Sequence, residues 1–123
     1  MKIFVIWIDR EHAKVFAFSR DSMERQQFHA HRNDHHTHLR DGIAHQREEN
    51  TLFSDVTKHI QAATNLLVIG PGVAKHHFQN YLCEHYPALA RKITACKTVD
   101  YLTDGEIAAL ARDIFLVPKG QYK

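Results

Sequence analysis

The chain has 123 residues, a hydrophobic fraction of 44%, a charged fraction of 24% and a formal net charge of +2. These values are ordinary for one soluble globular domain spanning residues 1–123, which can bury a core without disulfides or metals. They exclude the strongly basic field that would by itself indicate nucleic-acid binding, and no apolar run is long enough to span a membrane.

The cysteine content favours the cytoplasm. Cys83 falls in a helical pattern and Cys96 in a strand pattern, and no secretion signal precedes them. Thiols stay reduced in the cytosol, so a disulfide between these two residues is not expected. We predict that both side chains are small buried hydrophobes.

Three short strands with tight polar turns are predicted first, at residues 2–8, 13–18 and 23–30. The first run is almost continuously apolar and includes Trp7, which indicates a central strand with both faces covered. The third run is more polar and suits a position nearer to an edge of the sheet. Short strands joined by tight turns are typical of an antiparallel meander.

Residues 31–47 change character, because few of them are apolar and neither a helical nor a strand period emerges. We predict a long exposed loop here, and loops of this length in compact domains are usually functional or disordered. A helix is predicted from about Asn50. Its apolar stripe consists of Leu52, Val56, Ile60 and Ala63.

An apolar run at residues 66–69 ends in Gly-Pro-Gly at residues 70–72, and a helical pattern follows directly. Glycine supplies backbone angles that other residues avoid, and proline cannot extend a strand ladder, so a sharp strand-to-helix turn is predicted. The N–H groups at a helix start attract anions, and this first turn carries Lys75, His76 and His77. A phosphate-binding turn is one interpretation, and a plain strand-to-helix connection is the other.

The rest of the chain continues to alternate helices and strands. Pro87 interrupts the helix, residues 92–98 alternate as a strand, and Thr103 and Glu106 have the spacing of a capping box. The predicted order is β-β-β-α-β-α-β-α. This order gives an α/β fold with a mixed sheet of about five strands and helices packed on its faces.

This order of elements resembles the ribonuclease-H-like fold of translational machinery components. More narrowly, it resembles the central domain of the eukaryotic and archaeal class I peptide release factors and of Pelota. The resemblance covers nearly the whole chain. It is carried by the hairpin at residues 4–16, the third strand running into a polar loop, the Gly-Pro-Gly turn with Lys75, His77 and Phe78, and residues 98–100 before the last helix. Within this group the chain is most similar to small bacterial translational machinery proteins.

The loop after the third strand departs from the release-factor pattern. In release factors that loop carries Gly-Gly-Gln, which enters the peptidyl-transferase centre. Residues 31–47 here contain one glycine, Gly42, and no Gly-Gly-Gln. The resemblance therefore implies no peptide release. Pelota also lacks the motif, and its relatives act in ribosome rescue or on idle ribosomes, which implies a role on the ribosome.

The same segment is rich in histidine, and the whole chain contains 11 histidines. Imidazole is a common ligand of zinc and of other divalent metals, so a metal site is one hypothesis. Its ligands would be His31, His35, His36 and His38. Their spacing matches no closed metal site, and a solvated loop whose histidines only tune charge is the plainer interpretation. Contact with RNA through arginines and stacked histidines is a third.

Asp9 follows the first strand, where nucleases of the ribonuclease-H fold place a magnesium-binding carboxylate. Two-metal chemistry needs several carboxylates that converge, and the other candidates are Asp55, Asp100 and Asp104. Asp9 is also a typical turn residue. A metal-dependent hydrolase or nuclease that uses Asp9 and the histidine-rich segment is therefore an alternative function.

We predict a translation-associated protein, with no assigned catalytic residue, that binds the ribosome or RNA. The predicted contacts are Arg32, Arg40, Arg47, Lys75, His76 and His77. A homo-oligomeric interaction module, formed for instance through strand edges, is a third hypothesis. The main prediction requires residues 31–47 and the Gly-Pro-Gly turn to lie on one rim and present positive charge to an anionic partner.

Overall fold

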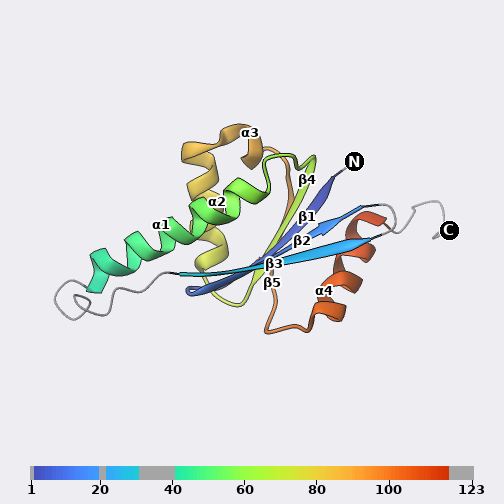
Figure 1. Cartoon of the computed structure of the whole chain (residues 1–123), viewed down its shortest axis with the longest axis horizontal. Helices are drawn as coiled ribbons and strands as arrows, with labels where there is room; N and C mark the ends of the chain where they lie inside the picture. The colour runs from blue at the N-terminus through green and yellow to red at the C-terminus, as the bar shows by residue number, and fades with distance from the viewer. Residues whose placement is uncertain (1, 20–21, 31–40, 117–123) are drawn as a thin grey trace.

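The computed structural model describes residues 2–19, 22–30 and 41–116 of the chain (Figure 1). Its centre is a five-stranded sheet with the order β3-β2-β1-β4-β5. Strands β1 (Ile3–Ile8), β2 (His12–Phe18) and β3 (Met23–His29) form the predicted antiparallel meander. Strands β4 (Asn65–Gly70) and β5 (Ile93–Thr98) run parallel to β1, so the mixed sheet is confirmed.

Strand β1 lies in the middle of the sheet, between β2 and β4. Its side chains alternate between two hydrophobic clusters, one on each face. Ile6 and Ile8 belong to the first cluster, and Val5 and Trp7 belong to the second. A strand buried on both faces needs an almost continuous apolar run, which explains the sequence of β1.

Helices cover both faces of this sheet (Figure 1). The first cluster contains residues of α1 (Asp41–His59), α2 (Ala74–His85) and α3 (Pro87–Ala90). The second contains residues of α4 (Asp104–Ala111), which continues into a π-helical turn at Arg112–Leu116. No helix in the described ranges combines the length and apolar character needed to cross a membrane.

Helix α1 begins at Asp41, nine residues before the predicted start, so the loop expected at residues 31–47 is wrong for residues 41–47. This part of the sequence lacks an apolar stripe but contains strong helix formers such as Ala44, Gln46 and Arg47. Figure 1 shows the first turns of α1 extending beyond the sheet. Because this part of the sequence has no apolar stripe, helical periodicity gives no signal there.

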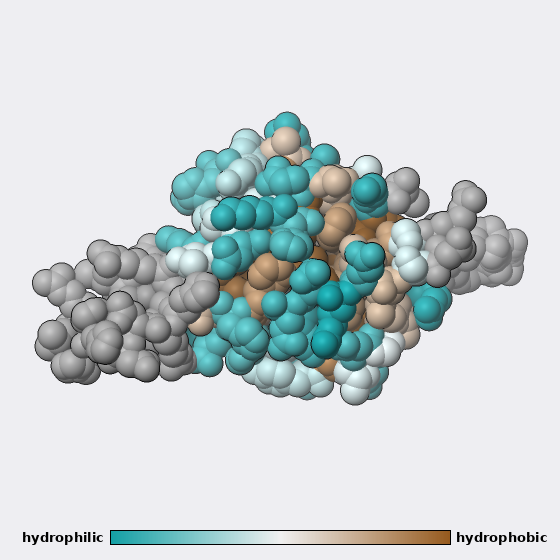
Figure 2. Space-filling view, viewed as in Figure 1, coloured by the Kyte–Doolittle hydropathy of each residue, from teal (hydrophilic) through white to brown (hydrophobic). Residues whose placement is uncertain are grey.

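The edge strand β3 is exposed at most of its positions, as its polar sequence predicted. In the space-filling view, hydrophilic residues cover most of the region where β3 lies (Figure 2). The expectation for the cysteines was wrong in part: both thiols are unpaired, but Cys83 is exposed and Cys96 is half-buried. Cys83 lies on the outer side of α2. A helical pattern predicts the helix but does not decide which side a small residue such as cysteine occupies.

The start of α4 is fixed by its cap and by ion pairs. The Thr103 side chain accepts a hydrogen bond from the Glu106 N–H (3.1 Å), and the Thr103 N–H donates to the Glu106 carboxylate (2.8 Å), which confirms the capping box. Asp104 pairs with Arg25 of β3 at 2.9 Å and with Lys14 of β2 at 3.6 Å. These contacts hold the start of α4 against the antiparallel half of the sheet.

Gly70, the last residue of β4, lies very close to the backbone of β1. A Cβ atom built on Gly70 would lie 2.1 Å from the carbonyl oxygen of Ile8 and 3.2 Å from its carbonyl carbon. A Cβ atom on Gly72 would meet no heavy atom within 4 Å. No glycine in the described ranges has a positive φ, so the expectation that this turn needs special glycine angles was wrong. Gly70 is required instead by the close approach of two backbones.

We predict that Gly70→Ala destabilises the fold while Gly72→Ala does not. The added methyl group at residue 70 meets backbone, which cannot rotate away as a side chain can. We expect Gly70→Ala to lower the free energy of unfolding by roughly 1–3 kcal/mol or more. Gly72→Ala should stay within about 0.5 kcal/mol of the wild type. Urea denaturation followed by circular dichroism measures both, and equal midpoints for the two variants would contradict this account of Gly70.

Candidate functional site

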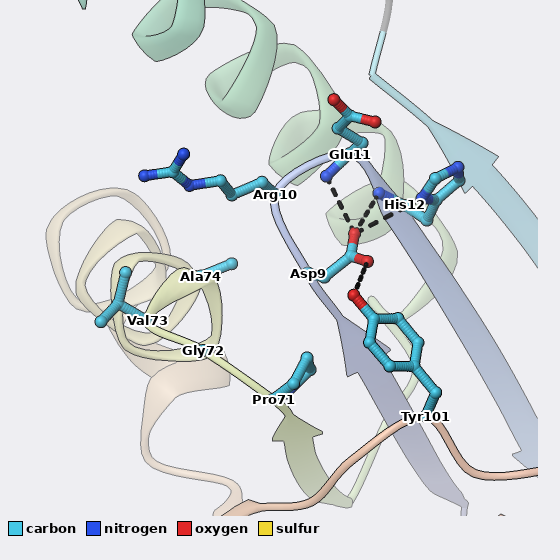
Figure 3. A pocket seen from close by; sticks show the side chains of 9 residues that line it. All are labelled: Asp9, Arg10, Glu11, His12, Pro71, Gly72, Val73, Ala74 and Tyr101. Carbon is cyan, nitrogen blue, oxygen red and sulfur yellow. Dashed lines mark hydrogen bonds and ion pairs between the residues drawn. The ribbon is translucent and has the colours of Figure 1, made fainter.

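A pocket of about 730 Å³ opens at the carboxyl ends of β1 and β4 (Figure 3). The chain leaves β1 towards β2 on one side and leaves β4 towards β5 on the other, so the connections diverge here. Open α/β sheets bind ligands at such points. The pocket is lined by Asp9, Arg10, Glu11, His12, Pro71, Gly72, Val73, Ala74 and Tyr101.

Asp9 organises the turn between β1 and β2. Its Oδ1 accepts hydrogen bonds from the N–H groups of Glu11 (2.9 Å) and His12 (2.7 Å). Its Oδ2 accepts a hydrogen bond from the Tyr101 hydroxyl (3.2 Å). Because both oxygens have partners within the protein, the plainer interpretation of Asp9 as a turn residue is confirmed.

Tyr101 follows β5 and forms one wall of the pocket. Its side chain is 72% exposed, yet its ring lies against Trp7, with 5.1 Å between the ring centroids. The indole N–H of Trp7 donates to the carbonyl of Asp100 at 3.1 Å, which fixes the backbone beside Tyr101. The negative charge of Asp9, followed by partial desolvation and the hydrogen bond to Asp9, raises the pKa of Tyr101 above its ordinary value.

The first turn of α2 forms the opposite wall. Val73 is the N-cap of α2, makes no side-chain capping bond and is 52% exposed. Figure 3 shows the Arg10 side chain directed away from Asp9, on the side of the pocket where Val73 and Ala74 lie. Arg10 is exposed. The pocket thus combines an apolar wall at α2 with a polar side at the β1–β2 turn, where Arg10 and His12 accompany the carboxylates of Asp9 and Glu11.

The three basic residues predicted for this turn do not share one surface. Lys75 is only 2% exposed and its ammonium group donates a hydrogen bond to the Gly72 carbonyl, so the expectation that it contacts an external anion is corrected. His76 is exposed. His77 is also exposed, but its Nδ1 lies 3.1 Å from a carboxylate oxygen of Glu49, linking α2 to α1.

Lys75 lies on the buried side of α2, near the half-buried Cys96 of β5. Burial raises the pKa of the Cys96 thiol, and the positive charge of Lys75 opposes this shift. The ammonium of Lys75 therefore acts inside the fold. It holds the Gly72 carbonyl and so steadies the turn that shapes one wall of the pocket.

The histidine-rich segment falls mainly outside the described residues. That part includes His31, His35, His36 and His38, the four predicted metal ligands, as well as Arg32 and Arg40. Arg47 lies on α1, and its side chain is not among those described. Within the described ranges, no group of three or more His, Cys, Asp or Glu side chains is placed to hold a metal ion.

The chain enters that segment from the same edge of the sheet that carries the pocket. His29, the last residue of β3, pairs with His12, and their ring centroids lie 5.0 Å apart. The Ala30 N–H donates to the Glu11 carbonyl at 2.8 Å. Strand β3, which leads into the predicted RNA-binding segment, therefore ends beside the β1–β2 turn. The prediction that this segment and the Gly-Pro-Gly turn share one rim requires β3 to end there.

Sequence reasoning singled out Asp9 and the Gly-Pro-Gly turn but not Tyr101, Arg10 or Val73 as site residues. Tyr101 carries a weak signal, because it follows the last strand and the carboxyl ends of parallel strands meet at one edge. An exposed aromatic residue just beyond such a strand is a candidate for binding. Its contact with Trp7 spans most of the chain and cannot be read from local sequence.

Comparisons with known proteins identify similarity in sequence to one protein and in fold to several solved structures. An alignment of 75 positions with the protein pelota homolog of Methanosphaera stadtmanae is 33% identical, and it covers 52% of this chain and 21% of that protein. No family model matches the chain.

Three solved structures share the fold. Pelota of Archaeoglobus fulgidus has a TM-score of 0.62 and 19% identity over 98% of this chain and 36% of its own. The archaeal translation termination factor aRF1 has a TM-score of 0.69 and 15% identity, over 98% of this chain and 36% of its own. Dom34 of S. cerevisiae has a TM-score of 0.58 and 10% identity, over 93% of this chain and 34% of its own.

The chain therefore spans about a third of the length of these structures. It resembles the central domain of Pelota and the release factors, in fold over almost all of its length and in sequence over the segment shared with pelota. The resemblance found in the sequence is confirmed at this level.

We predict that Asp9→Asn lowers the pKa of Tyr101 towards that of a free tyrosine. Asparagine keeps a side-chain oxygen that accepts from the turn N–H groups, but it removes the negative charge that opposes tyrosinate formation. Ultraviolet absorbance of tyrosinate during an alkaline titration measures the change.

The chain contains four tyrosines, so the titration of Tyr101→Phe is subtracted to isolate Tyr101. In the wild type, Tyr101 should ionise at higher pH than a tyrosine that has no carboxylate beside it. If wild type and Asp9→Asn titrate at the same pH, the electrostatic contact between these side chains is absent in solution.

Proposed function

We propose that this chain is a cytoplasmic, translation-associated protein that binds the ribosome through RNA. The observation that carries the proposal is the sequence similarity to pelota, supported by a fold shared with Pelota and aRF1 over nearly the whole chain. Yeast Dom34 is described as a translation termination-like factor involved in RNA quality control pathways and interacting with Hbs1. A role of this class fits the present chain.

The proposed role is binding without peptide-release chemistry. The sequence contains no Gly-Gly-Gln, and residues 31–47 hold only one glycine. The residues described at the pocket support recognition better than hydrolysis, because both oxygens of Asp9 are engaged by the turn and by Tyr101. Asp104, another candidate metal ligand, is paired with Arg25 and Lys14.

The proposed contact surface is the end of the sheet that carries the pocket, where strands β1 and β4 finish. Arg10 and His76 are exposed on this part of the described structure. We propose that Arg32, Arg40 and Arg47 add positive charge from the segment that follows β3. Phosphate contacts of this kind supply most of the affinity of sequence-independent binding to nucleic acid, and they weaken as salt competes.

We predict that the protein co-sediments with ribosomes at low salt and is released as salt rises from about 50 to about 200 mM. Replacing Arg32, Arg40 and Arg47 together by alanine should weaken binding about tenfold or more. The slope of log affinity against log salt should fall by about one for each phosphate group that the variant can no longer neutralise. Quantitative pelleting over a salt series measures both quantities.

A matched control removes three positive charges from the opposite edge of the sheet. Lys2 precedes β1, and Arg91 and Lys92 precede β5. Replacing these three by alanine should leave ribosome binding within about twofold of the wild type, because they lie at the amino ends of the parallel strands. No co-sedimentation of the wild type at low salt, or equally weakened binding in the two triple variants, would count decisively against the proposed surface.

A further inference from the structure

Tyr101 is the most exposed large hydrophobic side chain in the described part of the molecule, at 72%, and it faces the pocket between β1 and β4. We propose that this pocket binds an unpaired RNA nucleotide, whose base stacks on Tyr101 and whose phosphate lies near Arg10. The inference rests on the proposed function, because it specifies which part of an RNA partner would bind at the proposed contact surface. It assigns the recognition of single-stranded RNA to residues outside the histidine-rich segment.

The Tyr101 ring is held in place although it is exposed. Trp7, which is only 3% exposed, lies against it with 5.1 Å between ring centroids. Asp9 accepts a hydrogen bond from its hydroxyl at 3.2 Å. A side chain fixed at both ends loses little conformational freedom when a ligand covers it, so more of the stacking energy contributes to affinity.

The opposite wall of the pocket is also apolar and exposed. Val73 is 52% exposed, and Pro71 lies beside it in the turn that leads into α2. The volume of about 730 Å³ falls in the range of small-molecule pockets. A flat aromatic base has room to stack on Tyr101 in this space and would remove part of its exposed ring from water.

Arg10 is the group at the pocket that suits a phosphate attached to that base, and the nearby Asp9 carboxylate is engaged by the turn N–H groups, by His12 at 3.5 Å and by Tyr101. Arg10 is exposed and directed towards the side where α2 begins, while Figure 3 shows the Glu11 carboxylate pointing away from the centre of the pocket. The start of α2 has no side-chain cap, so its positive end faces the same space. Arg10 provides the charge contact, and the helix start adds to it.

The part of the pocket formed by Tyr101, Pro71 and Val73 offers little for reading the edge of a base. Both Asp9 oxygens already accept hydrogen bonds within the protein, and the walls opposite are the apolar residues Pro71 and Val73. Stacking tolerates any base, whereas edge contacts select one. The site is therefore suited to unpaired RNA with little preference for sequence.

The test uses the full chain and a fluorescein-labelled single-stranded RNA of about ten uridines, a length typical of such sites. Fluorescence anisotropy at low salt should give about tenfold or greater weakening for Tyr101→Ala. Tyr101→Phe, which keeps the ring, should restore most of the affinity. Arg10→Ala should weaken binding and lower the salt slope by about one. Tyr86→Ala, at another exposed tyrosine (37%) outside the pocket, should match the wild type.

A second readout comes from Trp7, the single tryptophan of the chain. Because it lies against Tyr101, its emission should change when the RNA binds, and a duplex RNA of the same length should change it far less. Tyr101→Ala binding the uridine strand as tightly as Tyr86→Ala would overturn the inference. So would binding that leaves Trp7 emission unchanged.

The two proposals fail in different ways. If the wild type pellets with ribosomes but does not bind the uridine strand, or binds it independently of Tyr101, the nucleotide pocket is wrong and the ribosome proposal stands. If the wild type binds neither ribosomes nor single-stranded RNA, both proposals are overturned.

Discussion

The close backbone contact between β1 and β4 is the constraint on which the rest of this structure depends. Gly70 lies so near Ile8 that no other residue type fits without moving one of the two strands. This contact joins the antiparallel meander to the parallel half of the sheet. Each half alone would leave one side of β1 without hydrogen-bond partners and an apolar strand in contact with water.

The pocket is a consequence of how the two halves meet. At the carboxyl end of β1 the chain turns back around Asp9, and at the end of β4 it turns into α2 through Pro71. These turns diverge and leave a space between them. Tyr101 completes the space from a third strand, and Trp7, a residue of β1 itself, anchors it through its ring and through Asp100. The central strand therefore supports both the core and the wall of the candidate site.

Much of this fold is predictable from the sequence, because the features that specify it are local. The apolar run of β1, the polar sequence of β3 and the spacing of Thr103 and Glu106 each indicate their structure over a few residues. The start of α1 is not predictable from periodicity, because residues 41–47 carry no amphipathic stripe. Propensity was the remaining signal, and it is weaker than periodicity.

The candidate site was predictable only in part, because its residues meet through tertiary contacts. The burial of Lys75 is an exception, because its spacing along α2 indicates it. Lys75 lies three and seven residues before Phe78 and Leu82, two fully buried residues of α2, so its position is on the inner stripe of the helix despite its charge. Tyr101 offers no such local clue, because Trp7 and Asp9 lie more than ninety residues away in the chain.

Only some of the basic residues of this protein are available to a polyanion, because the fold engages several of them internally. Lys14 and Arg25 are paired with Asp104, and Lys75 is buried against the Gly72 carbonyl. Arg10 has no ion pair among the described residues and lies at the rim of an apolar pocket. At this pocket a partner would contact the Arg10 side chain and the exposed ring of Tyr101. Stacking supplies affinity that does not require a large basic field, so net charge alone is a poor guide to the ligand of this site.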